Sequence, residues 1–214
     1  MLSLSVQHTR LTIGEPDEQR ARAYAYSSLR KLPAALTYHS LAHTCDDVVP
    51  AVERLAALLG VAGENLVLLR TAAYFHDTGF VERRDKHEAA SARLATSVLP
   101  YCGYTPSQIA AIERMIMATR LPQTPHTLLE QILADADLDS LAREDFLGTS
   151  LALRAELAGF DPEIPETTWY ARQLDFLRRH RYFTPAARAL RDAGKQRNIA
   201  QLEQLISTGG RGIL

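Results

Sequence analysis

The sequence predicts an all-α protein, in which a helical bundle is followed by a C-terminal helical extension. Apolar residues recur at helical spacing along most of the 214-residue chain, and prolines and capping residues separate the apolar segments. No segment shows the sustained alternation of apolar and polar residues that is typical of a strand. Hydrophobic residues make up 46% of the chain and charged residues 23%, which is the balance of a packed globular protein.

Two helices are expected before residue 60. The first is predicted to begin near Glu15-Pro16-Asp17, because proline suits the first helical turn and acidic residues suit its positive end, and to stop near Pro33. The second is predicted over residues 43–59, where the apolar positions share one helical face. These positions are Val48, Val52, Leu55, Ala56 and Leu59.

The third predicted helix, residues 65–77, is apolar nearly all round apart from Arg70. A helix without a polar face is usually buried in a core. This helix ends in His76 and Asp77, and burying titratable groups costs free energy unless they meet partners. We therefore expect this pair to have partners in the interior.

Three more helices are expected before residue 140. One covers about residues 86–99 and stops at Pro100. The next begins at Thr105-Pro106, a capping residue followed by proline at the first helical position. The third begins at about Thr127 and runs into residues 135–137.

The composition changes beyond residue 160. We divide the chain into a domain of residues 1–160 and a helical extension of residues 161–214 that packs on the same bundle. In the extension, residues 168–180 have the pattern of an amphipathic helix, and Pro185 opens a last helix that we expect to be interrupted around Gly194.

Charge and cysteine content exclude several classes of protein. The chain has 24 basic and 25 acidic residues and a net charge of −1, so it has no electrostatic footprint for duplex nucleic acid or an anionic membrane surface. Its two cysteines, Cys45 and Cys102, indicate neither a disulfide framework nor a zinc-thiolate site. No signal-peptide pattern and no membrane-spanning apolar run is present, so we expect a cytoplasmic protein.

Four short segments carry side chains suited to metal chemistry. Histidine and carboxylate ligands together suit divalent ions such as Mn, Fe, Co, Ni, Zn or Mg, and ligands from separate helices fit a site in a bundle core. Negative charge at a helix C-terminus is unfavourable unless a cation compensates it. The candidates are His39 and His43, His76 and Asp77, His87 and Glu88, and Asp135, Asp137 and Asp139.

The order of His43, then His76-Asp77, then an aspartate in ILADADLDSL resembles the HD-domain superfamily of metal-dependent phosphohydrolases. The resemblance covers roughly residues 25–145 and implies an HD-domain helical bundle. It also implies one divalent metal ion, with Mn, Ni, Co, Fe, Zn and Mg all open, held by His43, His76, Asp77 and Asp137.

The last ligand is a choice between two aspartates. Members of the superfamily often have Ala-Asp followed by an apolar residue at this point. Ala136-Asp137-Leu138 fits that frame better than Ala134-Asp135-Ala136. We take Asp137 as the ligand and Asp135 as support at the helix end.

Two further histidines are candidates for proton transfer. Tyr38-His39 with His43 is similar to the motif of cyclic-nucleotide phosphodiesterases, in which the first histidine is a general acid, although Ser40 replaces the usual asparagine. His87-Glu88 resembles a bacterial HD subgroup with a His-Glu pair on the helix after the HD loop. His87 is therefore expected to bind a phosphate oxygen or to protonate a leaving group.

Carboxylates and basic residues near the HD pair complete the predicted site. Asp77 is expected to orient the attacking water, and Glu82 is a further catalytic candidate, although a solvated side chain is its favoured interpretation. Arg and Lys beside a metal site suit a phosphoryl substrate, with a solvated loop as the alternative. The predicted substrate-binding residues are Arg83, Arg84, Lys86 and Arg120.

Several histidines and the extension are given structural roles. His126 lies in a proline-bounded loop, and we expect it not to be a ligand, which favours one metal and disfavours the di-iron oxygenase branch of the superfamily. His180, Tyr182 and Lys195 are expected to pack against the bundle, with contact to the pocket as the alternative.

The predicted function is hydrolysis of phosphomonoester or phosphodiester bonds in a small molecule, with a nucleotide as the favoured substrate. The alternatives are a non-catalytic nucleotide-sensing HD module, an alarmone hydrolase, and a structural bundle without metal. Alarmone hydrolases usually have a Glu-Asp pair soon after the HD pair, and here only Glu82 stands there. A homodimer is left open.

Overall fold

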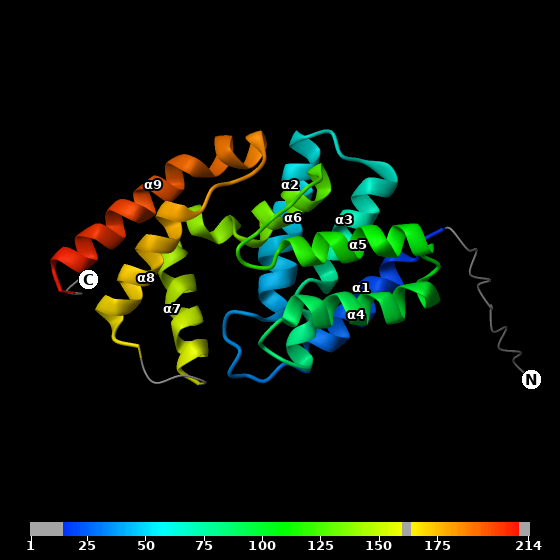
Figure 1. Ribbon diagram of the computed structural model, residues 1–214, viewed down its shortest axis with the longest axis horizontal. Coiled ribbons are helices and arrows are strands. Elements are labelled where there is room, and N and C mark those ends of the chain that lie inside the picture. The colour runs from blue at the N-terminus through cyan, green and yellow to red at the C-terminus, as the bar shows by residue number, and fades with distance from the viewer. Residues whose placement is uncertain (1–14, 160–163, 210–214) are drawn as a thin grey trace, which may run out of the picture.

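A computed structural model describes residues 15–159 and 164–209 (Figure 1). Within these ranges the chain is all-α, as predicted, with nine α-helices, short 3-10 and π segments, and no strand. The elements are α1 (Glu18–Leu29), η1 (His43–Val48), α2 (Val49–Leu58), α3 (Gly63–Phe75), η2 (Thr78–Val81), α4 (His87–Val98), η3 (Leu99–Cys102), α5 (Pro106–Ala118), α6 (Leu128–Asp137), η4 (Asp139–Ala142), α7 (Phe146–Ala158), α8 (Glu166–Arg179) and α9 (Pro185–Ser207).

Helices α1 to α6 form one bundle around a first hydrophobic core, with α3 packed against α1, α2, α5 and α6. The predicted burial of residues 65–77 is confirmed from Leu68 onward, where every residue except Arg70 is buried, whereas Asn65 is exposed. Arg70, the exception in the sequence, donates a hydrogen bond of 2.7 Å to Glu18 of α1. The centre of the bundle is therefore apolar up to the point where His76 follows α3.

Side-chain caps begin the helices where the sequence predicts them. Thr105 and Thr127 form capping boxes with Gln108 and Glu130, and Asp17 accepts a hydrogen bond from the backbone of α1. Such caps satisfy backbone N–H groups that have no partner within the helix. They set where α6 starts and, through its length, where Asp137 lies.

The helix predicted over residues 43–59 is confirmed, but its first turns are wound as a π-helix. Single π-turns in α-helices often occur at functional sites. His43 is the first residue of this segment and is buried.

Helices α7, α8 and α9 surround a second hydrophobic core beside the α1–α6 bundle (Figure 1), and α9 also contacts the bundle through α2. Phe146 of α7, Trp169 of α8 and Leu202 of α9 all belong to this core. The sequence analysis missed α7 altogether. The predicted boundary between residues 160 and 161 lies outside the described residues, whereas α7 shares its core with α8 and α9.

Helix α9 runs without a break through Gly194, so the predicted interruption there is wrong. A Cβ atom at Gly194 would lie 2.1 Å from the carbonyl oxygen of Ala142 in η4. Glycine at this position therefore serves close packing between α9 and η4 rather than a bend in the helix. None of the helices in the described ranges is both long and apolar enough to cross a bilayer.

Candidate metal centre

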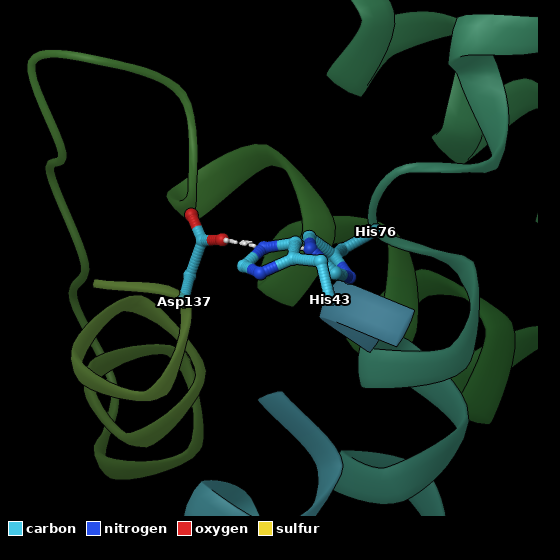
Figure 2. A group of neighbouring side chains, drawn as sticks. All are labelled: His43, His76 and Asp137. Atoms are coloured by element: carbon cyan, nitrogen blue, oxygen red, sulfur yellow. Dashed lines mark hydrogen bonds and ion pairs between the residues drawn. The ribbon is translucent and has the colours of Figure 1, made fainter. Parts of the chain in front are cut away.

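Three elements bring one cluster of ligand groups together. His43 opens η1, His76 follows α3 and Asp137 ends α6, and their side chains converge (Figure 2). One ligand atom from each lies within 4.8 Å of the others. Asp137 Oδ1 is 3.3 Å from His43 Nε2 and 3.4 Å from His76 Nε2.

Asp77 adjoins this cluster through one carboxylate oxygen. Its Oδ2 lies 3.2 Å from His76 Nε2 and 3.8 Å from His43 Nε2. The four residues predicted as ligands, which come from three distant parts of the sequence, are therefore neighbours in the fold.

The two histidines present Nε2 to the cluster. His76 Nδ1 lies 2.8 Å from the carbonyl oxygen of Ala73, which can only accept, so Nδ1 carries hydrogen and Nε2 of the neutral ring offers a lone pair. His43 Nδ1 lies 3.7 Å from a carboxylate oxygen of Asp47, too far for a hydrogen bond, and the Asp47 carboxylate accepts a hydrogen bond from Arg143. A hydrogen bond from the ring nitrogen that does not face the metal, as at His76, is the usual arrangement of a metal-binding histidine.

The cluster contains buried polar atoms without hydrogen bonds. Among the described residues, His43 Nδ1, His76 Nε2 and Asp77 Oδ2 have no hydrogen-bond partner. His76 Nε2 and Asp77 Oδ2 are close to each other but lack the geometry of a hydrogen bond. Buried polar atoms are normally partnered, and mixed imidazole and carboxylate donors suit a divalent transition metal. The residues therefore fit a metal ion.

Charge in the cluster is balanced between imidazoles and carboxylates. Burial would raise the pKa of Asp137, but the adjacent imidazoles of His43 and His76 outweigh it and hold that pKa at about 2. Burial would lower the pKa of His43, but Asp137 and Asp47 raise it to about 9. In the same way the pKa of Asp77 lies well below its usual value and that of His76 well above. The imidazoles and the carboxylates of the cluster thus favour opposite charges on one another.

Asp135 points elsewhere. Its carboxylate accepts hydrogen bonds from the backbone of Phe183 at 2.7 Å, and from the backbone and hydroxyl of Thr184 at 2.8 and 2.7 Å. Thr184 is the N-cap of α9. The geometry thus favours Asp137 over Asp135 as the ligand and gives Asp135 the task of anchoring α9.

Asp139 is also outside the cluster. It accepts two hydrogen bonds of 2.7 Å from Arg191 of α9 and one of 2.9 Å from Arg54 of α2. This network joins the two helical groups of the molecule.

A cavity of about 710 Å³ is lined by Asp77 and Asp137 and lies between the two helical groups. The bundle supplies one side of it, and helices α7 and α8 supply much of the other. The apolar part of its lining includes Phe80, Leu121, Leu138, Leu141, Leu153, Leu157, Trp169 and Phe176. The extension therefore forms a wall of the cavity as well as packing against the bundle.

Basic side chains line the same cavity. Arg84, Lys86 and Arg120, three of the four predicted substrate-binding residues, are among them, and α8 adds Arg172 and Arg179. Lys86 has a φ of 58°, in the left-handed region that is uncommon for a residue other than glycine. Arg83 is exposed and outside the lining, so nothing in the geometry supports its predicted role.

Two histidine rings stack against Phe80 beside the cluster. The Phe80 ring centre lies 4.2 Å from that of His39 and 4.0 Å from that of His87. This packing depends on Gly79, where a Cβ atom would lie 2.0 Å from the carbonyl oxygen of His87. Glycine thus allows η2 to lie directly against α4.

The two histidines differ in their hydrogen bonds. His87 Nε2 lies 3.4 Å from Asp77 Oδ1, and its Nδ1 lies 3.2 Å from the carbonyl oxygen of Arg84, so both ring nitrogens are engaged. His39 uses only Nδ1, which lies 2.6 Å from Glu156 Oε1.

Glu156 and Asp47 are neighbours of the site that the sequence analysis missed. Asp47 had a signal, because it is four residues after His43 and lies on the same helical face. The only signal for Glu156 is an acidic residue among apolar neighbours in the segment LALRAELA.

The remaining predicted residues lie at or beyond the edge of the cavity. Glu88 lines it, and one of its oxygens is 3.8 Å from His87 Nε2. Glu82 is exposed and paired with Arg93 outside the lining, and His126 is exposed.

His180, Tyr182 and Lys195 of the extension do not contact the cavity, and one of them, Tyr182, packs in the core of the bundle. Lys195 Nζ donates a hydrogen bond to the backbone carbonyl oxygen of His180. The hydroxyl of Tyr182 donates a hydrogen bond to the backbone carbonyl oxygen of Leu138. All three side chains are outside the cavity lining.

Comparison with protein-family models, with curated proteins and with solved structures found no match.

Proposed function

We propose that this protein is a metal-dependent hydrolase of phosphomonoester or phosphodiester bonds, of the HD type, acting on a nucleotide-type small molecule. One observation carries the proposal. His43, His76 and Asp137 converge with Asp77 at a cavity, and buried ligand atoms among them lack hydrogen bonds. A site of this kind binds a cation where a small molecule can reach it.

The charges around the cavity support a phosphate substrate. Within the described part of the chain, Lys86, Arg120 and Arg172 line the cavity and have no ion-pair partner. Arg and Lys are the side chains that bind phosphoryl oxygens, through charge-assisted hydrogen bonds. A phosphate between them and a metal would be neutralised from both sides.

The apolar wall supports a substrate with a flat apolar part. Trp169 and Phe176 of α8 and Leu153 of α7 line the cavity across from the ligand cluster. Its volume of about 710 Å³ falls within the roughly 300–1,000 Å³ of small-molecule sites. A nucleotide combines a phosphate with a planar base and suits both parts of the lining.

In the proposed reaction, the metal ion and the protein side chains have different roles. A divalent ion held by the four ligands would activate water and offset phosphate charge. Asp77 would orient the attacking water, while Lys86 and Arg120 would stabilise the negative charge that develops on the phosphoryl oxygens. His39 or His87 would give a proton to the leaving oxygen.

Replacing Asp137 tests the proposal directly. We expect purified wild-type protein to bind about one divalent ion per chain and, with Mn²⁺ or Ni²⁺, to hydrolyse at least one phosphate ester in a panel of nucleotides and aryl phosphates. Asp137→Ala should lose the metal and reduce turnover by about 100-fold or more, because a ligand is removed. Elemental analysis and phosphate release measure the two effects.

Asp46→Ala is the matched control, because Asp46 lies in the same region as His43 but is exposed. It should retain both metal and turnover. Unchanged metal content and activity in Asp137→Ala would refute the proposal. A wild-type protein that binds nucleotides but turns none over would instead support the nucleotide-sensing alternative.

A further inference from the structure

A buried carboxylate from helix α7 holds the loop that carries His39. Glu156 of α7 is 1% exposed, and its Oε2 accepts hydrogen bonds from the backbone N–H groups of Tyr38 at 2.9 Å and His39 at 3.0 Å. Its Oε1 lies 2.6 Å from His39 Nδ1. One carboxylate therefore restrains both the backbone and the ring of the same residue.

Glu156 is ionised in this environment. Burial would raise its pKa, but the hydrogen bonds from His39 and Tyr38 lower it below the usual value. An ionised carboxylate can only accept hydrogen bonds, so His39 Nδ1 must carry a hydrogen. Nε2 then accepts a hydrogen bond when the ring is neutral and donates one when it is protonated.

The free nitrogen of His39 is available to the cavity. His39 lines the cavity with 21% of its side chain exposed, and Nε2 has no hydrogen-bond partner among the described residues. Stacking on Phe80 fixes the plane of the ring. His87 stacks on the same Phe80 ring, with its ring centre 5.8 Å from that of His39, but both of its nitrogens are already engaged.

We propose that Glu156 is a positioning residue that orients His39 so that His39 Nε2, rather than His87, gives the proton to the leaving group. This inference rests on the proposed phosphohydrolase function for its chemical step, whereas the pairing of Glu156 with His39 can be tested without activity. It makes α7 a part of the active site, although Glu156 lies 117 residues after His39 in the sequence.

The step balances as a hydrolysis. The oxygen of water forms a bond to phosphorus while the bond from phosphorus to the leaving oxygen breaks. The leaving oxygen keeps the electron pair of the broken bond and takes the proton from His39 Nε2. The proton that the attacking water loses returns to His39 through solvent, so the ring is regenerated.

The tautomer of His39 tests the pairing. We expect long-range ¹H–¹⁵N NMR of the wild-type protein to find the hydrogen of the neutral ring on Nδ1. In Glu156→Gln the amide oxygen must still accept the two backbone N–H groups, so the amide NH₂ faces the ring and the hydrogen should move to Nε2. His39→Gln assigns the resonance.

Thr37→Ala is the matched structural control. The Thr37 hydroxyl donates a hydrogen bond of 2.8 Å to the carbonyl oxygen of Ala152, so it joins the same loop to the same helix without touching His39. This variant should keep the wild-type tautomer. A neutral wild-type ring with its hydrogen on Nε2 would overturn the inference, even if Glu156→Gln fails to fold.

The leaving group tests the chemical role. Proton donation matters for a poor leaving group and little for a good one. Glu156→Gln should therefore lower kcat about tenfold or more for phenyl phosphate and much less for p-nitrophenyl phosphate, and His39→Gln should show the same selectivity. Thr37→Ala should affect both substrates equally.

The two proposals fail in different ways. If no phosphate ester is hydrolysed, the proposed function fails while the tautomer still decides the pairing. If the wild-type protein is active and Glu156→Gln lowers both rates by the same factor, Glu156 is only structural and the inference is wrong. If the double variant Glu156→Gln/His39→Gln is much slower than His39→Gln alone, Glu156 does not act through His39.

Discussion

Asp135 and Asp137 show how two residues of one short motif acquire different tasks. Side chains two residues apart on a helix point about 200° apart, so they cannot face the same site. Asp137 faces the histidines, and Asp135 faces the N-terminus of α9. Both are acidic residues near a helix end, yet one is compensated by imidazoles and the other by N–H and O–H donors.

Replacing Asp135 should therefore affect stability rather than metal binding. Asp135→Ala leaves the buried backbone N–H groups of Phe183 and Thr184 without their acceptor. We expect a loss of about 2–4 kcal/mol in the free energy of unfolding, measured by urea titration. The folded fraction should keep its metal, which elemental analysis would check. A change below about 0.5 kcal/mol, comparable with a surface substitution, would contradict this assignment.

At the scale of elements, helix α7 was not predicted from the sequence, although it supplies Glu156. Its start lacks a side-chain cap, and apolar residues occur around its whole circumference rather than along one stripe. Such a pattern has no clear helical period. The helix is stabilised by packing, with Phe146 buried in the second core and Leu153 and Leu157 packed against it.

Two glycines, Gly194 in α9 and Gly148 in α7, should respond in opposite ways to alanine. Gly194→Ala places a methyl group 2.1 Å from the backbone of η4 and should destabilise the protein by about 1–3 kcal/mol. A Cβ atom added at Gly148 in α7 would meet no atom within 4 Å. Gly148→Ala should therefore stabilise the protein by about 0.5–1 kcal/mol, because alanine has a higher helix propensity than glycine. Urea unfolding measures both, and equal effects would argue against the packing of α9 on η4.

At the scale of the whole molecule, the candidate metal ligands connect separate elements. His43, His76 and Asp137 come from η1, the end of α3 and α6. A ligand that binds only the folded state stabilises it by mass action. A metal at this site would therefore strengthen the bundle against unfolding as a whole.

Metal removal should lower thermal stability. At a free metal concentration of 100 times Kd, the expected stabilisation is about 2.7 kcal/mol, and a chelator should abolish it. Differential scanning calorimetry of wild-type protein with and without Mn²⁺ measures the shift in Tm. Asp137→Ala should show little or no shift, whereas an equal shift in both proteins would place the stabilising ion elsewhere.

The sequence by itself determined the all-α class, the starts of most helices and the four candidate ligands. These depend on local signals, because apolar periodicity, proline and side-chain caps act within a few residues of the chain. The buried α3 with two titratable groups after it was enough to predict a polar cluster in the interior.

The tertiary structure decided which of these residues meet. It separated Asp137 from Asp135, left Arg83 outside the cavity, and kept α9 continuous through Gly194. It also brought Glu156 to His39 across 117 positions of the chain. Such contacts depend on the facing and distance of packed helices, which no local pattern contains.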